Sequence, residues 1–161
     1  MEMTTVKGAG CLFIQGDYVL TGYNPKFNIW SGIGGKVEPG ESPRITAYRE
    51  TIEELFGFNP SQKILDDCEA AFGMLPLNIR DNYGVIKISF DLYVHLSYIL
   101  RANNCISPFY NKIPISFEDI LTERKKIENA EITELKVINF KGSNPDISTD
   151  LLLDCMAPLI K

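Results

Sequence analysis

Three glutamates follow one arginine in close succession, as Arg49, Glu50, Glu53 and Glu54. The segment 42–56 predicts a helix, and at about 100° per residue the three carboxylates share one side of it, away from the apolar side chains. Like charges at this spacing repel, and the C-terminal end of a helix disfavours them further. Arg49 can neutralise Glu53, but a hard divalent cation would compensate far better, because Mg²⁺ and Mn²⁺ prefer clustered carboxylate oxygens. An ordinary acidic face in water is the alternative interpretation.

A glycine turn precedes this helix. Gly34 and Gly35 leave backbone N–H and C=O groups open to close approach by a ligand. The turn 38–41 then returns the chain to the helix, which Ser42 is expected to cap and Gly57 to end. A glycine turn that leads into a helix with clustered acids indicates a metal ion held against a polyphosphate.

Residues 34–58 read GGKVEPGESPRITAYRETIEELFGF and resemble the box of the Nudix hydrolase family, G-x5-E-x7-R-E-U-x-E-E-x-G-U, where U is a bulky apolar residue. Six fixed positions agree in type and spacing: Gly35, Glu41, Arg49, Glu50, Glu53 and Glu54. Thr51 stands at the first U, and Phe56 is an extra residue before Gly57, so the helix should end one residue late without disturbing the acids. The resemblance implies an α+β fold, the Nudix-type α/β/α sandwich with a mixed central β-sheet.

The resemblance also implies a role for each matching residue. Glu50, Glu53 and Glu54 would ligate one to three Mg²⁺ or Mn²⁺ ions, and the carbonyl oxygen of Gly34 would complete a metal shell. Arg49 would hold Glu53 or its neighbour by a salt bridge. The family hydrolyses nucleoside diphosphates linked to another group, by attack of water at phosphorus.

A carboxylate must take the proton from that water, and the family varies in which one does so. Glu50 is one candidate. The others are glutamates close to the last predicted strand: Glu128, Glu131 and Glu134. We favour Glu131, and the alternative is that all three of these are surface residues. Glu41 would support the turn or reach a metal through water.

The stretch 30–37, WSGIGGKV, is similar to the W-N-G-F-G-G-K-V of the MutT-like, oxidised-purine nucleoside triphosphatases. This resemblance implies cleavage of oxidised or non-standard nucleoside triphosphates to monophosphate and pyrophosphate. Ser31 replaces the Asn that reads the base in that group, and a hydroxyl cannot make the same paired hydrogen bonds. Lys36 could contact a phosphate. Aromatic side chains that could stack on a base, or instead pack within the loop and core, are Tyr23, Phe27, Trp30 and Tyr83.

Three other functions stay open on the sequence alone. An mRNA-cap or other RNA 5′-end hydrolase would explain the basic run 124–126, although the acidic composition argues against it. A diphosphoinositol polyphosphate hydrolase would need more lysine and arginine around the site. A non-catalytic nucleotide-binding sensor would be expected to lose one of the box glutamates, and none is lost.

The length of 161 residues suits one domain, 1–161, and a composition of 45% hydrophobic and 23% charged residues excludes a wholly disordered chain. The net charge of −5 disfavours a dedicated nucleic-acid binder. No segment has the ~18 apolar residues of a membrane span, and the N-terminus lacks the layout of a signal peptide. The cysteines form no metal-binding pair, so free thiols in a reducing compartment are expected, cytoplasmic or nuclear. We expect a monomer or homodimer that acts on a small nucleotide, with no membrane partner.

Hydrophobic patterning predicts the elements that position the site. The expected strands are 8–14, 18–20, 68–77, 85–96 and 134–140, of which the first two form a hairpin. The expected helices are 42–56, 116–129 and 147–156, the last capped by Asp146 or Ser148. Residues 101–115 are expected to form a long loop. Strands and helices mix without strict alternation, which favours a layered α+β domain.

Overall fold

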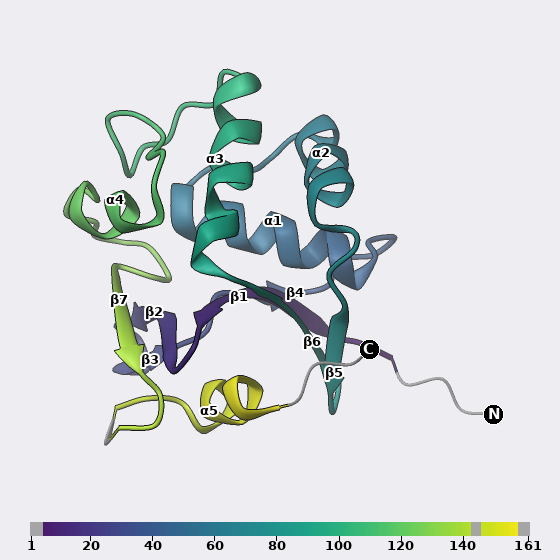
Figure 1. Ribbon diagram of the computed structural model, residues 1–161, viewed down its shortest axis with the longest axis vertical. Coiled ribbons are helices and arrows are strands. Elements are labelled where there is room, and N and C mark those ends of the chain that lie inside the picture. The colour runs from purple at the N-terminus through teal and green to yellow at the C-terminus, as the bar shows by residue number, and fades with distance from the viewer. Residues whose placement is uncertain (1–4, 143–145, 158–161) are drawn as a thin grey trace.

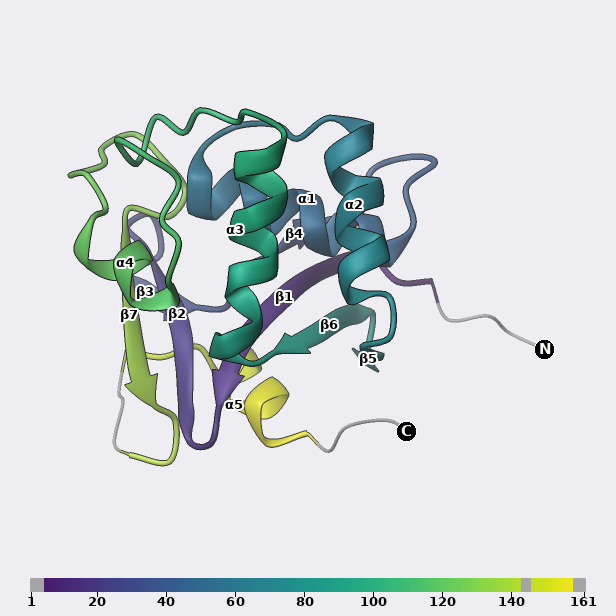
Figure 2. The same ribbon diagram turned by 45° about the horizontal axis from the view of Figure 1, so that its top comes forward.

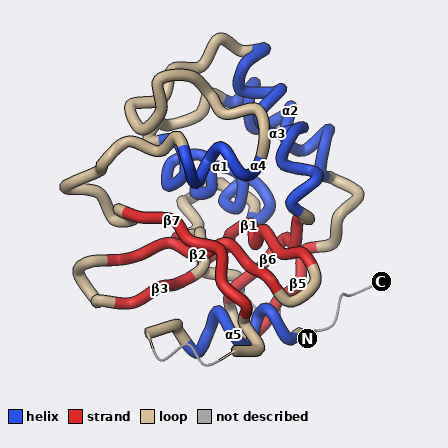
Figure 3. Tube along the Cα trace, turned by 60° about the vertical axis from the view of Figure 1, so that its left-hand side comes forward, coloured by secondary structure: helices blue, strands red, loops and turns tan. Residues whose placement is uncertain are grey.

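A computed structural model describes residues 5–142 and 146–157. A central sheet lies between two layers of helices (Figure 1). Three helices cover one face: α1 (Pro43–Phe56), α2 (Gln62–Phe72) and α3 (Tyr93–Ala102). One helix, α5 (Thr149–Met156), covers the opposite face, and Figure 3 shows the strands between the two layers. The short helix α4 (Phe117–Thr122) lies at the β7 (Glu134–Asn139) side of the molecule in Figure 1 and Figure 2.

The sheet is mixed. Its order is β3-β2-β1-β6-β5, with β4 paired to β1 and β7 paired to β2. The strands besides β7 are β1 (Gly8–Gln15), β2 (Tyr18–Asn24), β3 (Ile29–Ser31), β4 (Gly35–Lys36), β5 (Leu77–Arg80) and β6 (Tyr83–Ile88). β1 and β6 run parallel, whereas every other pair is antiparallel. The α/β/α sandwich with a mixed central sheet is therefore confirmed.

The loop before α1 crosses β1 at very short range. Gly8 pairs with Lys36 and Ala9 with Gly35, so β4 lies along the start of β1. A Cβ at Gly10 would collide with the carbonyl oxygen of Ile33. Glycine at this position of β1 therefore lets the glycine turn pass against the sheet, directly beside α1.

Helix α1 has the predicted limits, and both departures from the box have a structural reason. The hydroxyl of Ser42 accepts from the backbone N–H of Ile45 at 3.2 Å, and Gly57 ends the helix with φ +78°. Thr51 is buried, and its hydroxyl accepts from the backbone N–H of Cys11 in β1 at 3.3 Å. Phe56 is fully buried among aromatic rings of the core.

Two predicted strands are wrong. Residues 68–72 end helix α2, because the apolar side chains from Ile64 to Phe72 recur at helical spacing and Ser61 caps the helix at Ile64 N. In 85–96 only the start is a strand, since β6 ends at Ile88 and a 3₁₀ turn leads into α3. There the buried side chains Tyr93, Leu96 and Leu100 also fit three- and four-residue spacing. The helix expected over 116–129 ends at Thr122.

The other predicted elements are confirmed with small changes of boundary. The hairpin of β1 and β2 turns at Gly16, which has φ +58°. The last strand is β7, and Ser148 caps α5 through a bond from the N–H of Leu151 at 3.1 Å. All four cysteines are free thiols. Among the described residues, no helix is long and apolar enough to cross a membrane.

Each face of the sheet buries its own cluster of apolar side chains. Alternate residues of β1 point to opposite faces, so Cys11 and Phe13 belong to the larger cluster below α1 to α3. Leu12 belongs to the smaller cluster below α5, together with Val85 and Leu151.

Candidate active site

Arg49, in the middle of α1, is the centre of the acidic face. Its Nε and Nη2 donate to the two oxygens of Glu41 at 2.7 and 2.9 Å, and Nη2 also donates to the carbonyl oxygen of Lys36 at 2.9 Å. Its Nη1 donates to Glu50 at 2.9 Å and to Glu53 at 3.3 Å. The hydrogen bonds from Arg49 lower the pKa of Glu41 to about 2. Arg49 thus ties the loop before α1 to the glutamates on the helix.

Glu54 is held by the backbone and by no cationic side chain in the described part of the chain. Its Oε2 accepts from the N–H of Gly34 at 2.9 Å, and the residue is buried. Burial raises the pKa of Glu54 to about 9, and the charges of Glu131 and Glu50 add to the rise. The buried carboxyl of Glu54 therefore has a backbone N–H as its partner and no cationic side chain beside it among the described residues.

Glu50 depends on the second glycine of the turn. A Cβ at Gly35 would collide with the carboxylate of Glu50, so only glycine lets that side chain lie against the loop. Burial raises the pKa of Glu50 above its ordinary value, although Arg49 opposes the rise. Glu131 is exposed, and its charge acts on both Glu50 and Glu54, which places it close to the acidic face.

The donor chemistry of this face fits a hard divalent cation. Glu50, Glu53 and Glu54 offer only carboxylate oxygens, which suit Mg²⁺ or Mn²⁺. Burial raises the pKa values of Glu50 and Glu54, and neighbouring carboxylates add to the rise, so a cation at this face would favour their charged forms. In this conformation no three acidic, histidine or cysteine side chains among residues 5–142 and 146–157 form a group that could hold a metal ion. The glutamate side chains would have to turn to share one ion, since Glu50 and Glu53 face Arg49.

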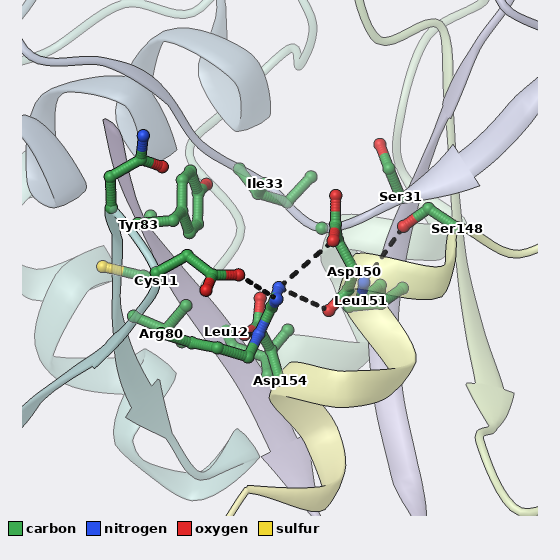
Figure 4. Close-up of a pocket in the computed structure, with 15 residues that line it drawn as sticks. Cys11, Leu12, Ser31, Ile33, Arg80, Tyr83, Ser148, Asp150, Leu151 and Asp154 are labelled. Carbon is green, nitrogen blue, oxygen red and sulfur yellow. Dashed lines mark hydrogen bonds and ion pairs between the residues drawn. The ribbon is translucent and has the colours of Figure 1, made fainter. Parts of the chain in front are cut away.

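A pocket of about 420 Å³ opens on the α5 face, beyond the glycine turn (Figure 4). Its walls come from β1, the segment 31–33, the β5–β6 turn and α5. Tyr83 lines the pocket, and its hydroxyl lies against Gly34, where an added Cβ would collide with it. Burial raises the pKa of Tyr83, and the charges of Glu54 and Asp154 add to the rise.

Two residues that line this pocket, Arg80 and Asp154, are not indicated by any motif in the sequence. Arg80 Nε donates to Asp154 at 2.8 Å across 74 positions of sequence. No local spacing relates two residues so far apart, and the strand that carries Arg80 was predicted in the wrong place. The pairing depends on α5 lying across β5 and β6.

The substrate residues predicted from sequence do not all lie together. Ser31 lines the pocket. Trp30 packs against Tyr23 with ring centroids 5.1 Å apart, and it does not line the pocket. Phe27 is 67% exposed, and Lys36 is exposed on β4 beside the acidic face. Their contacts with a substrate stay predictions.

The first residue of the basic run 124–126 is engaged in contacts within the protein. Arg124 Nη1 donates to the carbonyl oxygen of Leu55 at 2.8 Å, at the end of α1. Its guanidinium also lies 4.9 Å from the ring centroid of Phe109. Arg124 therefore binds the C-terminal end of α1. Residues 124–126 do not belong to a helix.

Comparison with known proteins agrees with the box. Residues 4–72 match the family model described as the NUDIX domain. A search of the curated proteins finds no match. Among solved structures, the chain is similar to a hydrolase of the NUDIX family from Clostridium perfringens, with 15% identity, a TM-score of 0.45, and coverage of 95% of this chain and 94% of that one. It is also similar to a MutT NUDIX hydrolase from Burkholderia pseudomallei, with 14% identity, a TM-score of 0.42, and coverage of 93% and 96%.

A further similar structure is a bifunctional NMN adenylyltransferase/ADP ribose pyrophosphatase from Francisella tularensis, complexed with AMP and Mn ion. It shares 17% identity at a TM-score of 0.43, and the match covers 85% of this chain but 36% of that one. The matched residues 4–72 of the family model contain the glycine turn, Arg49 and all three helix glutamates. By sequence, residues 4–72 of this chain therefore match the NUDIX domain.

Proposed function

We propose that the protein is a Mg²⁺- or Mn²⁺-dependent pyrophosphohydrolase of nucleoside triphosphates, oxidised or otherwise non-standard, which releases a monophosphate and pyrophosphate. The observation that carries this proposal is the acidic face on α1, where a buried arginine aligns Glu41, Glu50 and Glu53 beside a glycine turn. The similarity of residues 30–37 to the oxidised-purine triphosphatases supports the nucleotide class. The pocket beyond Gly34 offers room for the nucleoside end.

Glu50, Glu53 and Glu54 would hold the metal ions, together with the carbonyl oxygen of Gly34. Such an ion neutralises charge on the bridging and leaving phosphate oxygens. Arg49 keeps Glu50 and Glu53 in place, and the N–H of Gly34 fixes Glu54. The exposed Lys36 would contact a phosphate oxygen.

Glu131 would take the proton from the attacking water, and Glu50 is the second candidate. Glu131 is exposed to water and lies close enough to raise the pKa values of Glu50 and Glu54. Glu131→Gln should therefore lower kcat by about 10²- to 10⁴-fold, the usual contribution of a positioned base. Glu128→Gln is the matched control, because Glu128 is exposed on the same segment and pairs only with Lys126 among the described residues. If Glu50→Gln alone causes the loss, the assignment passes to Glu50.

A substrate panel tests the proposal. Normal and oxidised dNTPs, capped RNA, a dinucleoside polyphosphate and a diphosphoinositol phosphate would be incubated with and without Mg²⁺. Turnover of dNTPs that needs Mg²⁺ and is lost in Glu53→Gln is the expected result, with the exposed Glu118→Gln as control. Activity confined to capped RNA would refute the nucleotide assignment. Tight nucleotide binding without turnover of any substrate would point to a sensor instead.

A further inference from the structure

Arg124 bonds to two segments of the chain that carry proposed catalytic groups. Its Nη1 donates to the carbonyl oxygen of Leu55 at 2.8 Å, and its Nη2 donates to the carbonyl oxygens of Glu54 at 3.4 Å and Ile132 at 3.5 Å. Glu54 is a proposed metal ligand near the end of α1, and Ile132 directly follows the proposed base, Glu131. One guanidinium therefore connects the backbone of the glutamate-bearing helix with the backbone beside the base.

The guanidinium of Arg124 is held in one place by its surroundings. It lies 4.9 Å from the ring centroid of Phe109 and 5.8 Å from that of Tyr110, and its Nη1 also donates to the hydroxyl of Tyr110 at 3.3 Å. Its Nε is buried and has no hydrogen-bond partner among the described residues. The two rings thus hold the planar group while its Nη groups bond to both segments. A lysine ammonium is a single compact charge and does not reproduce this fork.

The segment that carries the proposed base is also attached to the sheet. The side chain of Ile132 is buried and packs against Gly22 of β2, where an added Cβ would collide with it. The N–H of Thr133 donates to the carbonyl oxygen of Tyr23 at 3.1 Å. Residues 123–133 contain no helix or strand, so these contacts and the guanidinium determine where the base lies relative to α1.

A second side chain caps the same end of α1 from a different segment. The hydroxyl of Ser107 donates to the carbonyl oxygen of Phe56 and accepts from the N–H of Phe109. Within the described chain, Ser107 makes no hydrogen bond to residues 131–133. Ser107 therefore caps the helix without connecting it to the proposed base, which separates the two effects that Arg124 combines.

We propose that Arg124 is a positioning residue: it fixes the backbone beside Glu131 against the C-terminal end of α1, and thereby keeps Glu131 within reach of the attacking water. This inference rests on the proposed function, in which Glu131 is the base. Arg124 acts through Glu131 and not by contact with a phosphate, because its Nη groups donate to protein oxygens and its Nε is buried. A displacement of about 1 Å between reacting groups can lower a rate about 10²-fold, so loss of this connection should be visible in kcat.

A double-mutant cycle of Arg124→Lys and Glu131→Gln tests the inference. The kcat and KM of Mg²⁺-dependent dNTP hydrolysis would be measured at a temperature where circular dichroism shows every variant folded. Arg124→Lys alone should lower kcat by about 10- to 100-fold and change KM by less than about twofold. In the Glu131→Gln background the same substitution should lower kcat by less than about twofold, because the base is already absent. A purely structural role of Arg124 predicts the same loss in both backgrounds.

Ser107→Ala is the matched control, since it removes a cap from the same helix end and should leave kcat unchanged in both backgrounds. Equal losses of kcat for Arg124→Lys in the two backgrounds, or no loss, would overturn the inference. The assignment of Glu131 as the base then still stands if Glu131→Gln alone is inactive, so the two failures are distinguishable.

Hydrogen exchange of the Thr133 amide gives a measurement that does not depend on activity. Arg124→Lys should raise its exchange rate by about 10-fold, because the segment loses its connection to α1, whereas Ser107→Ala should not. If no substrate is hydrolysed, the proposed function fails. Faster exchange in Arg124→Lys alone would then still support the hold of Arg124 on this segment, and unchanged exchange would overturn it.

Discussion

Replacing Glu41 by Gln tests whether Arg49 depends on that carboxylate. Glu41 accepts two hydrogen bonds from Arg49, and the two side chains are 11% and 7% exposed. The pairing lowers the pKa of Glu41 from 4.5 to about 2. At 1.36 kcal/mol per unit, this difference corresponds to about 3 kcal/mol of folding free energy at pH 7. Gln keeps one acceptor oxygen, so the expected loss in Glu41→Gln is about 2–3 kcal/mol.

The pH dependence of that loss gives a sharper test. Because the folded pKa of Glu41 is depressed, its stabilisation is fully present above pH 5 and disappears as the pH falls toward 2. In urea unfolding, the free energy of unfolding of Glu41→Gln should therefore be lower than that of the wild type at pH 7. This difference should become smaller between pH 5 and pH 3. Glu38→Gln is the control, since Glu38 lies 3.6 Å from the same arginine but is 63% exposed, and its loss should stay below about 1 kcal/mol. The stabilising role of the Glu41–Arg49 pair would be refuted if the two free energies of unfolding differed by less than about 1 kcal/mol at pH 7, or if their difference did not change with pH.

Three further variants test other contacts. Gly10→Ala should lower the free energy of unfolding, measured in urea, by roughly 3 kcal/mol or more, because the new Cβ would collide with the backbone of Ile33. Gly16→Ala is the control: Gly16 has φ +58° and open space around it, so the free energy of unfolding should fall by only about 1 kcal/mol. Gly35→Ala should remove most of the hydrolase activity by displacing Glu50, and unchanged kcat would contradict the close approach seen here. Arg124→Lys should lower the melting temperature by about 4–8 °C, measured by calorimetry, since the bond to Leu55 and the contact with Phe109 contribute about 2 kcal/mol.

An element of this fold can be predicted from the sequence when the residues that define it lie close together in the chain. Helix α1 was predictable because its cap, its end and its apolar stripe all lie within 42–57. The strand predicted over 85–96 was wrong because its apolar residues satisfy both alternating and helical spacing where α3 begins. Ser61, which caps α2, is the residue in the sequence that indicates where this helix begins. The pairing of Arg80 with Asp154 could not be predicted, since it depends on the packing of α5 against the sheet.

Part of the net charge of −5 is concentrated in two regions, the acidic face of α1 and the pocket on the α5 face. On α1, Arg49 offsets part of the charge, while Glu54 relies on burial and one backbone N–H. In the pocket, Arg80 offsets one of three carboxylates, those of Asp81, Asp150 and Asp154. Under the proposed function, a polyphosphate would therefore meet carboxylates at both ends of the site. Among the described residues, the set of glutamates suited to a divalent cation lies at the α1 end, where such an ion would invert the local field. The proposed function therefore predicts that the phosphates bind at the α1 end.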